Sequence, residues 1–244
     1  MTIFNQTVLI TGGGSGIGLA IAHSLLEAGN RIVLVGRNEA KLRKAAELVP
    51  GVATIVADIT NAADVARLVQ QVQTEFKDLS VLVNNAGQAS AYQLVAGANA
   101  FEKASAEMNT NYLATIRLTE LLLPVLSQQP TAAIINVTSI VAYVPAAGAP
   151  TYSASKAAVH AYTQALRHTL KPTNIRVFEL MPPLVNTEFS AEISGENGIP
   201  PQQVAEELLA GLANGDDEIR VGQTAQLYEL ERASRADAFA LVNG

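Results

Sequence analysis

A tyrosine and a lysine, Tyr152 and Lys156, lie four residues apart in a stretch rich in helix-favouring residues. On an α-helix this spacing puts both side chains on one face, about 6 Å apart along the axis. A free phenol has a pKa near ~10, and a neighbouring ammonium group favours its ionised form. The pair is therefore a candidate proton donor and acceptor near neutral pH. The alternative is an ordinary solvated helix face, on which the same spacing often occurs by chance.

The stretch that carries this pair is one of many regular elements that the sequence predicts. Pro150 stands where a helix begins, and Lys171-Pro172 marks its end. Short apolar runs rich in β-branched residues alternate along the chain with segments of helical spacing. This alternation predicts an α/β fold: one domain over residues 1–244, with a Rossmann-like, doubly wound parallel sheet of about seven strands and helices on both faces. The expected strands are 7–11, 31–35, 53–57, 81–83, 133–137, 175–180 and 218–221, and the expected helices are 17–28, 38–48, 61–76, 99–126, 150–170, 202–213 and 223–241.

The composition excludes several classes of protein. Hydrophobic residues make up 49% of the 244 residues and charged residues 16%, which indicates a large buried core. The net charge of -6, without any basic run, argues against nucleic acid or a membrane surface as a partner. The chain has no cysteine, which excludes disulfides, thiol catalysis and cysteine-ligated zinc.

Targeting and metal patterns are also missing from the sequence. The first residues show no basic region followed by an apolar stretch, and no apolar run reaches the about 18 residues of a membrane span. We therefore expect a soluble, cytoplasmic protein. The histidines His23, His160 and His168 show no metal-ligand spacing, so no metal is expected. His160 falls two turns after Tyr152 on the same face, where packing or an interface contact explains it better than catalysis.

A glycine cluster follows the first expected strand. Glycines at such a place let backbone N–H groups approach a pyrophosphate, and the following helix N-terminus favours its negative charge. The spacing is Gly-x-x-x-Gly-x-Gly and not the commoner Gly-x-Gly-x-x-Gly. The alternative, a flexible turn, is weakened by the strand and helix on either side, so we predict a dinucleotide site. The residues predicted to bind there are Gly12, Gly14, Ser15, Gly16, Ile17 and Gly18.

The ends of the next two expected strands would hold the adenosine half of the dinucleotide. A carboxylate after the second strand would bind a ribose 2′-hydroxyl, but the chain has Gly36, Arg37 and Asn38 there. The guanidinium fork suits a 2′-phosphate, which favours NADP(H) over NAD(H), unless Arg37 is only a surface residue of the turn. Asp58 and Ile59, after the third strand, could contact the adenine. An N-cap role for Asp58 is nearly as good an explanation.

Taken together, these motifs resemble the short-chain dehydrogenase/reductase family in its form with about 250 residues. The matching residues run from Thr7 to Thr187. They are Thr11-Gly-x-x-x-Gly16-x-Gly18, Asp58, Asn84-Asn-Ala-Gly87, Asn111, Ser139 and Tyr152-x-x-x-Lys156. The resemblance implies a catalytic tetrad of Asn111, Ser139, Tyr152 and Lys156, and further cofactor contacts from Asn85, Ala86, Gly87, Tyr152, Lys156, Pro182, Val185 and Thr187.

The reaction that the resemblance implies is hydride transfer between NADP(H) and a ketone or secondary alcohol. When a carbonyl is reduced, negative charge develops on its oxygen. Ser139 can donate a hydrogen bond to that oxygen, and Tyr152 can deliver the proton. Lys156 is expected to lower the Tyr152 pKa and, in this family, to hold the nicotinamide ribose. Asn111 resembles the family residue that connects the lysine to solvent through water. The predicted function is therefore NADPH-dependent carbonyl reduction of a small or medium ketone.

Three departures from the family pattern carry expectations of their own. Pro183 stands where the family usually has glycine, which predicts a different path for this loop. Residues 188–198 show no strong helix pattern, which predicts an open pocket. The tail at 223–241 replaces the glycine-rich end of the family. We therefore expect a homo-oligomer, and a homodimer through helices 99–128 and 152–171 rather than a homotetramer.

Two alternative functions remain. One is reduction of a 3-oxoacyl group on a carrier protein, although no basic cluster is visible near the site to dock an acidic carrier. The other is a non-catalytic NADP-sensing protein that retains the fold. The complete tetrad argues against the sensor, because a sensor does not need all four residues together.

Overall fold

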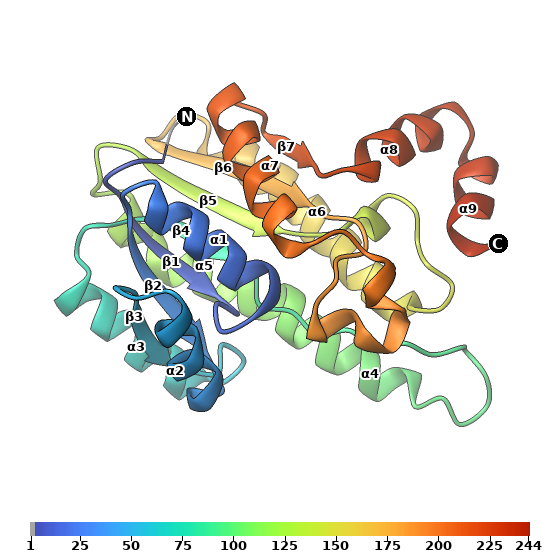
Figure 1. The fold of residues 1–244 in the computed structure, drawn as a ribbon, viewed down its shortest axis with the longest axis horizontal. Coiled ribbons are helices and arrows are strands. Elements are labelled where there is room, and N and C mark those ends of the chain that lie inside the picture. The colour runs from blue at the N-terminus through green and yellow to red at the C-terminus, as the bar shows by residue number, and fades with distance from the viewer. Residues whose placement is uncertain (1–2) are drawn as a thin grey trace.

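The structure, a computed structural model, describes residues 3–244. Seven strands in that range form one sheet. They are β1 Thr7–Thr11, β2 Arg31–Gly36, β3 Ala53–Val56, β4 Leu79–Asn84, β5 Ala132–Val137, β6 Ile175–Met181 and β7 Glu218–Arg220. Each strand runs parallel to its neighbours in the order β3-β2-β1-β4-β5-β6-β7 (Figure 1). The order reverses between β1 and β4, and this is the point at which open α/β sheets bind ligands. The predicted doubly wound sheet is confirmed.

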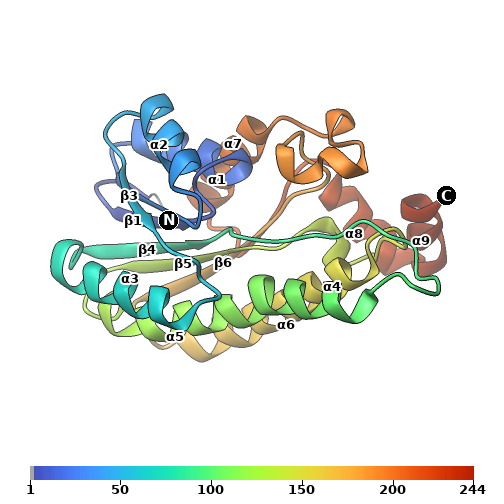
Figure 2. The ribbon, with the colours of Figure 1, turned by 90° about the horizontal axis from the view of Figure 1, so that it is seen from below.

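Helices cover both faces of the sheet. They are α1 Gly16–Glu27, α2 Glu39–Leu48, α3 Ala62–Glu75, α4 Ala100–Glu107, α5 Ala114–Leu126, α6 Pro150–Leu170, α7 Pro201–Asn214, α8 Gln223–Ala233 and α9 Arg235–Asn243. Figure 2 shows α1, α2 and α7 on one face, and α3, α4, α5 and α6 on the other. Ile10 and Leu9, neighbours in β1, belong to two different apolar clusters because successive strand residues point to opposite faces. Within residues 3–244, no helix has the length and apolar character needed to cross a membrane.

The helical region predicted over 99–126 contains a feature that the sequence did not indicate. Between α4 and α5 the chain forms a π-helical segment, Met108–Leu113. The three segments are contiguous, so this is one continuous helix whose pitch changes in the middle. The helix then continues past Pro124 to the end of α5 at Leu126. A π-helical segment has no periodicity signature of its own in so short a stretch. It rotates the residues that follow it relative to those that precede it.

The single final helix predicted over 223–241 is wrong. The chain forms two helices, α8 and α9, which Figure 1 shows beyond the end of the sheet. Ser234 between them has an extended backbone, and its hydroxyl accepts a hydrogen bond from the N–H of Asp237 at 3.3 Å. A serine in this role caps a new helix, so it interrupts the old one.

A line of buried amides ties the central strands to the helices of one face. The side chain of Asn84 donates hydrogen bonds to Asn136 at 2.8 Å and to Thr119 at 3.1 Å. Asn136 in turn donates to Thr163 of α6 at 2.9 Å. Because every amide hydrogen bond here is made in the dry interior, this line fixes β4, β5, α5 and α6 relative to one another. Asn84, the first residue of the Asn84-Asn-Ala-Gly87 motif, therefore stabilises the sheet.

Candidate functional site

A cavity of about 740 Å³ opens at the carboxyl ends of the central strands. Most of the residues that the sequence singled out lie around it. Those that line it are Gly12, Ser15, Gly16, Ile17, Asn85, Ala86, Gly87, Ser139, Tyr152, Lys156, Pro182, Val185 and Thr187. Of the other predicted residues, all of them within the described chain, those outside this lining are Gly14, Gly18, Arg37, Asn38, Asp58, Ile59 and Asn111. The fold thus brings residues from both halves of the chain to one place.

The turn between β1 and α1 is shaped by its glycines. Gly12 and Gly16 have φ angles of 65° and 54°, a region in which a side chain is strained. A Cβ on Gly18 would lie 2.5 Å from the Gly12 carbonyl oxygen, so Gly18 lets α1 pack directly on the turn. The side chain of Ser15, the N-cap of α1, makes no capping hydrogen bond. This turn therefore fits a pyrophosphate, because it presents a helix N-terminus and close backbone to the cavity.

The end of β4 is tied to this turn. The side chain of Asn85 donates hydrogen bonds to the carbonyl oxygens of Thr11 at 3.0 Å and Gly12 at 3.2 Å. The backbone N–H groups of Asn85 and Ala86 both donate to the Thr11 hydroxyl at 3.0 Å. A Cβ on Gly87 would lie 3.8 Å from Nζ of Lys156. The chain after β4 therefore runs between the glycine turn and the helix that carries Lys156.

Tyr152 and Lys156 lie on α6, which begins at Pro150 as predicted. Lys156 is buried, and its Nζ donates a hydrogen bond to the Val137 carbonyl oxygen at 2.8 Å and lies 5.7 Å from the centre of the Tyr152 ring. Ser139 lies two residues after the end of β5, and its hydroxyl is hydrogen-bonded to Tyr152. The end of β5 thus places a hydroxyl and a carbonyl oxygen against one face of α6. Tyr152, Lys156 and Ser139 converge on one wall of the cavity.

Burial dominates the electrostatics of this wall. It raises the pKa of Tyr152 above its ordinary value, and the buried Glu107 carboxylate adds to the rise, while the Ser139 hydrogen bond acts in the opposite direction. Burial also lowers the pKa of Lys156 to about 8, which the negative charge of Glu179 opposes. The expected lowering of the Tyr152 pKa is therefore not found, because burial is the largest cause and raises the pKa. A phenol with a raised pKa stays protonated at neutral pH.

Asn111 lies behind this wall, in the π-helical segment. Its amide oxygen accepts from the Gln88 N–H at 2.7 Å, and its amide nitrogen donates to the Gln88 carbonyl oxygen at 2.9 Å and to the Ser155 hydroxyl at 2.8 Å. Its backbone carbonyl oxygen accepts from Thr115 at 2.8 Å. Asn111 therefore joins the chain after β4 to α6. Its contact on α6 is Ser155, the residue before Lys156. Its predicted link from the lysine to solvent stays a prediction.

The predicted site for a 2′-phosphate lies at the edge of the glycine turn. Arg37 follows β2 and is exposed. The amide oxygen of Asn38 accepts a hydrogen bond from the N–H of Lys41 at 3.0 Å, so Asn38 is the N-cap of α2. That oxygen is therefore engaged within the protein. Contact of Arg37 and Asn38 with a cofactor stays a prediction.

The two residues predicted to contact the adenine already make contacts within the protein. Asp58 accepts hydrogen bonds from the N–H and hydroxyl of Thr60 at 2.9 and 2.7 Å. Asn61, and not Asp58, caps α3, so the alternative N-cap role for Asp58 is wrong. Ile59 is buried in the apolar cluster beneath the sheet. Its side chain therefore packs in the core, and contact of either residue with an adenine stays a prediction.

The segment over the cavity is more ordered than the sequence suggests. Residues Glu188–Ile193 and Gly195–Asn197 form two short 3₁₀ turns, although the sequence shows no strong helix pattern there. The expected open pocket stays a prediction. The ring of Phe189 lies 6.0 Å from that of Tyr152, centre to centre, and Phe189 and Ile193 line the cavity. The turns therefore cover the side of the cavity that faces the phenol.

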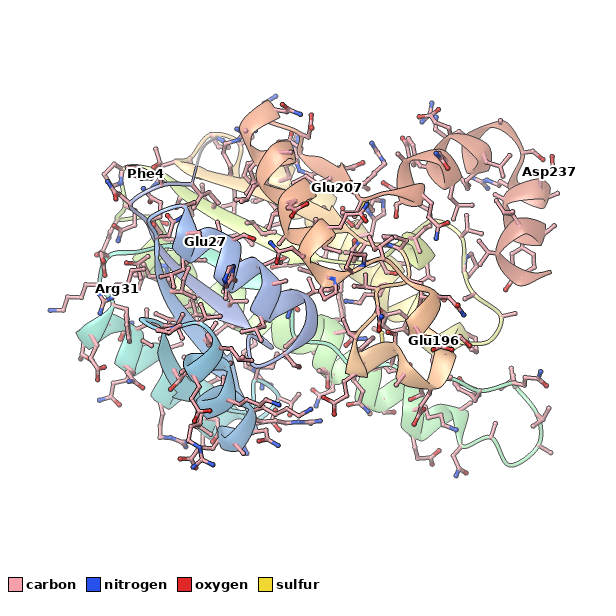
Figure 3. All side chains as sticks on the ribbon, viewed as in Figure 1. Phe4, Glu27, Arg31, Glu196, Glu207 and Asp237 are labelled. Atoms are coloured by element: carbon pink, nitrogen blue, oxygen red, sulfur yellow. The ribbon has the colours of Figure 1, made fainter. Side chains whose placement is uncertain are left out.

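Helices α8 and α9 form the far wall. Leu227 and Leu230 of α8 and Val242 of α9 line the cavity. Glu207 of α7, labelled in Figure 3, accepts a hydrogen bond from the N–H of Gly222 at 2.9 Å, directly before α8 begins. Gly222 has a φ of 53° and so favours glycine. This contact sets the direction in which α8 leaves the sheet, and with it the apolar far wall.

Two buried carboxylates near the site were missed by sequence reasoning. Glu107 is fully buried, and one of its oxygens accepts from the Ser90 N–H at 2.6 Å, while the other has no hydrogen-bond partner within the described chain. Glu179 of β6 is also fully buried and accepts from the Thr138 hydroxyl at 2.7 Å. Glu179 could have been found, because a carboxylate inside an otherwise apolar strand is unusual. Glu107 lies in a helix of mixed composition and carries no such signal.

Comparison with known proteins supports one family. The family model described as short chain dehydrogenase matches residues 6–198. The chain is 36% identical over 248 residues to the uncharacterized oxidoreductase DltE of Bacillus subtilis (strain 168), covering 100% of this chain and 98% of that protein. It is 32% identical over 217 residues to the uncharacterized oxidoreductase MW2403 of Staphylococcus aureus (strain MW2), covering 87% and 93%.

Solved structures agree with these relatives. A short chain dehydrogenase from Burkholderia cenocepacia J2315, in complex with NADP, has a TM-score of 0.88 and 31% identity over 99% of both chains. A short chain dehydrogenase/reductase from Burkholderia phymatum, in complex with NAD, has a TM-score of 0.87 over 100% of this chain and 97% of the other. At 20% identity that second structure shows only that the fold is shared. With its fold, its glycine turn and the matched family model together, the chain belongs to the short-chain dehydrogenase family of oxidoreductases.

Proposed function

We propose that this protein catalyses the reversible reduction of a ketone to a secondary alcohol, with NADPH as the electron donor. The observation that supports this most is the convergence of Ser139, Tyr152 and Lys156 on one wall of the cavity, beside the glycine turn. A hydroxyl pair and a buried ammonium group at one place are the groups that carbonyl reduction needs.

The cofactor is proposed to lie along the carboxyl ends of β1, β2 and β4. The glycine turn and the N-terminus of α1 would hold the pyrophosphate, and Arg37 the 2′-phosphate. Asn85 to Gly87, Val185 and Thr187 would line the nicotinamide end, where they already face the cavity. The NADP complex of the Burkholderia cenocepacia relative supports this choice. The nicotinamide supplies the hydride to the carbonyl carbon.

Side chains of the protein would polarise and protonate the carbonyl oxygen of the substrate. Ser139 donates a hydrogen bond to the carbonyl oxygen, and Tyr152 gives up its phenolic proton to the same oxygen as the alcohol forms. Burial raises the pKa of Tyr152, so the phenol enters the reaction in its protonated form. Lys156, as a cation, stabilises the phenolate that is left, and Tyr152 then regains a proton from solvent.

The lining of the cavity supports an uncharged substrate with an apolar body. Beyond Tyr152 the walls carry Phe189, Leu227 and Leu230. Among residues 3–244, the charged side chains in the lining are Lys156, Glu188 and Glu192. Glu188 is paired with Lys41 at 2.7 Å, so a carboxylate or phosphate on the substrate would meet the negative charge of Glu192. An acidic carrier protein would find no basic surface in the lining. Ketone reduction is therefore favoured over 3-oxoacyl reduction on a carrier.

The test is to follow NADPH and NADH oxidation with a panel of uncharged ketones and 3-oxo acids. Wild type should reduce ketones with NADPH, and Tyr152→Phe should lose roughly 10²–10⁴-fold in kcat while still binding NADPH. Tyr112→Phe is the matched control, because Tyr112 packs edge-on against Tyr162 away from the cavity. Tight NADPH binding without turnover of any ketone by wild type would support the sensor instead.

We also infer that the chain is one domain and assembles as a homo-oligomer, a dimer in the first instance. Phe101, Leu113 and Leu121 are 79%, 49% and 41% exposed, and lie on α4, α5 and the π-helical segment between them. Large exposed apolar side chains along one run of helix support a surface that another chain covers. A dimer through this face leaves the cavity open.

A further inference from the structure

A buried carboxylate and a histidine lie behind Lys156, outside the lining of the cavity. Glu179, at the carboxyl end of β6, is 0% exposed. Nδ1 of His160 lies 2.9 and 3.0 Å from its two carboxylate oxygens, and the Thr138 hydroxyl donates to the carboxylate at 2.7 Å. A buried carboxylate is costly unless it is paired, and Glu179 is paired on both sides.

These contacts form a closed ring of residues that includes Lys156. The lysine donates its hydrogen bond to Val137, and Val137 is followed by Thr138, which bonds to Glu179. Glu179 contacts His160, which lies on α6 one turn after Lys156. The ring joins β5, β6 and α6, and it includes the two residues that precede Ser139. A change in Glu179 would therefore be felt at Lys156 through both bonding and charge.

The charges of the ring are balanced against one another. Burial lowers the pKa of Lys156 to about 8, and the charge of Glu179 opposes that fall. The hydrogen bond to the same carboxylate raises the pKa of His160 above its ordinary value. When His160 is protonated, both its imidazolium and the ammonium group of Lys156 are attracted to the carboxylate of Glu179. When His160 is neutral, that charge faces Lys156 alone.

The other groups around His160 are accounted for by pairs of their own. Glu218 of β7 faces His160, but it forms salt bridges with Arg220 and, at 3.6 Å, with Arg167 of α6. The ring of Tyr143 packs edge-on against His160 at 5.2 Å between centres. His160, Glu179 and Glu218 have ligand atoms within 4.8 Å of one another, yet a metal ion there would face two guanidinium groups. The cluster is therefore better explained as a charge network than as a metal site.

We propose that Glu179 and His160 form a positioning pair for the reaction, in which Glu179 supplies the buried negative charge that keeps Lys156 cationic against Val137. This proposal rests on the proposed function, because it concerns the lysine that stabilises the Tyr152 phenolate. Glu179 acts through Lys156 and does not touch the cavity. At lower pH His160 is protonated, and its positive charge offsets part of the attraction between Glu179 and Lys156.

The pair is tested by two substitutions of similar size. Glu179→Gln keeps an oxygen for the Thr138 hydroxyl and removes the charge, so Lys156 should lose its proton at lower pH. The alkaline limb of kcat/KM for ketone reduction should then move down by about one pH unit or more, which is about tenfold less activity above the new midpoint. His160→Gln removes the competing cation and keeps the carboxylate, so the alkaline limb should stay in place or move up. Glu218→Gln is the control, because that carboxylate is held by arginines.

A readout independent of turnover separates this proposal from the proposed function. The titration of Lys156 Nζ is followed by NMR of the full-length protein with ¹⁵N-labelled lysine, assigned with Lys156→Met, in wild type, Glu179→Gln and His160→Gln. A lower midpoint in Glu179→Gln with no fall in His160→Gln supports the pair, even if no ketone is turned over. An unchanged midpoint in Glu179→Gln, or an equal fall in both variants, overturns it. Should Glu179→Gln not fold, Glu179→Asp is used instead. It keeps the charge, so the Lys156 midpoint should stay near its wild-type value. A fall of about one pH unit or more in Glu179→Asp, or a fall in His160→Gln, overturns the proposal.

Discussion

The side-chain amide of Asn111 donates a hydrogen bond to the Ser155 hydroxyl at 2.8 Å, and that hydroxyl donates to the carbonyl oxygen of Tyr152 at 2.7 Å. The first residue belongs to the π-helical segment and the other two to α6. The change of helical pitch before α5 is therefore joined to the turn of α6 that carries Tyr152 and Lys156. Two features that are far apart in the sequence hold one part of the site.

Removing this link should lower the stability of the protein. Ser155→Ala leaves the buried Asn111 amide one acceptor short, which should lower the free energy of unfolding by about 1–3 kcal/mol. Asn111→Ala should cost at least as much, and the double variant should cost less than the two single losses combined, because both remove the same bond. Urea unfolding measures all three. Ser127→Ala is the control, since its hydroxyl bonds to Leu123 at an exposed site, and strict additivity would contradict the link.

The packing of the glycine turn predicts a difference between two glycine substitutions. In Gly18→Ala the new methyl group would lie 2.5 Å from the Gly12 carbonyl oxygen, so α1 must move away from the turn. We expect a loss of about 1–3 kcal/mol in stability and weaker NADPH binding. In Gly14→Ala the nearest atom, Cβ of Lys41, is 3.4 Å away, so stability should change much less. Thermal unfolding and NADPH titration compare the two, and equal destabilisation would count against this account of the turn.

Cofactor preference should depend on the end of β2. Gly36→Asp combined with Arg37→Ala should shift the ratio of kcat/KM values for NADPH and NADH towards NADH by about tenfold or more, because a carboxylate replaces the guanidinium group beside the 2′-phosphate. A Cβ on Gly36 would lie 3.4 Å from Leu42, which is an ordinary van der Waals contact. Arg67→Ala on α3 is the control for loss of a surface charge. A ratio that stays unchanged in the double variant means that Arg37 does not bind the phosphate.

The exposed apolar face predicts how the protein assembles. Leu113→Glu and Leu121→Glu place a charge on that face and should shift sedimentation velocity profiles from dimer towards monomer at micromolar concentration. Leu48→Glu is the matched control, because Leu48 is 59% exposed on α2, on the opposite face of the sheet. A dimer that persists in both variants but dissociates in Leu48→Glu would place the interface on the other face.

Stability should depend on pH through His160. Its pKa is raised in the folded protein, first by the hydrogen bond with Glu179. The contribution of the protonated form is therefore fully present below the unfolded value of about 6.5 and is lost as the pH rises through the folded value. His160→Gln should unfold at a lower temperature than wild type at about pH 6, and the difference should narrow by about pH 9. His168→Gln, at an exposed position of the same helix, should show no such trend.

Much of the site could be predicted because its signals are local. The four-residue spacing of Tyr152 and Lys156 is set by the helical repeat, and the glycines between β1 and α1 are adjacent in the sequence. Apolar runs of strand length, alternating with helical patterns, were enough to predict a parallel sheet. The break before α9 was missed because a serine N-cap inside a helical pattern is a weak signal, and the π-helical segment has none.

The sequence by itself determined the types of the reactive groups and the faces on which they lie, because those follow from the periods of helices and strands. Only the tertiary structure decided their charge states. The Tyr152 pKa is raised and not lowered, since burial sums the loss of water over elements that are distant in the chain. Glu179 meets a histidine 19 residues away and a threonine 41 residues away, and no local pattern contains both distances. The burial and the charge of a side chain depend on which segments pack around it, and the packing of the helices on the sheet determines those segments.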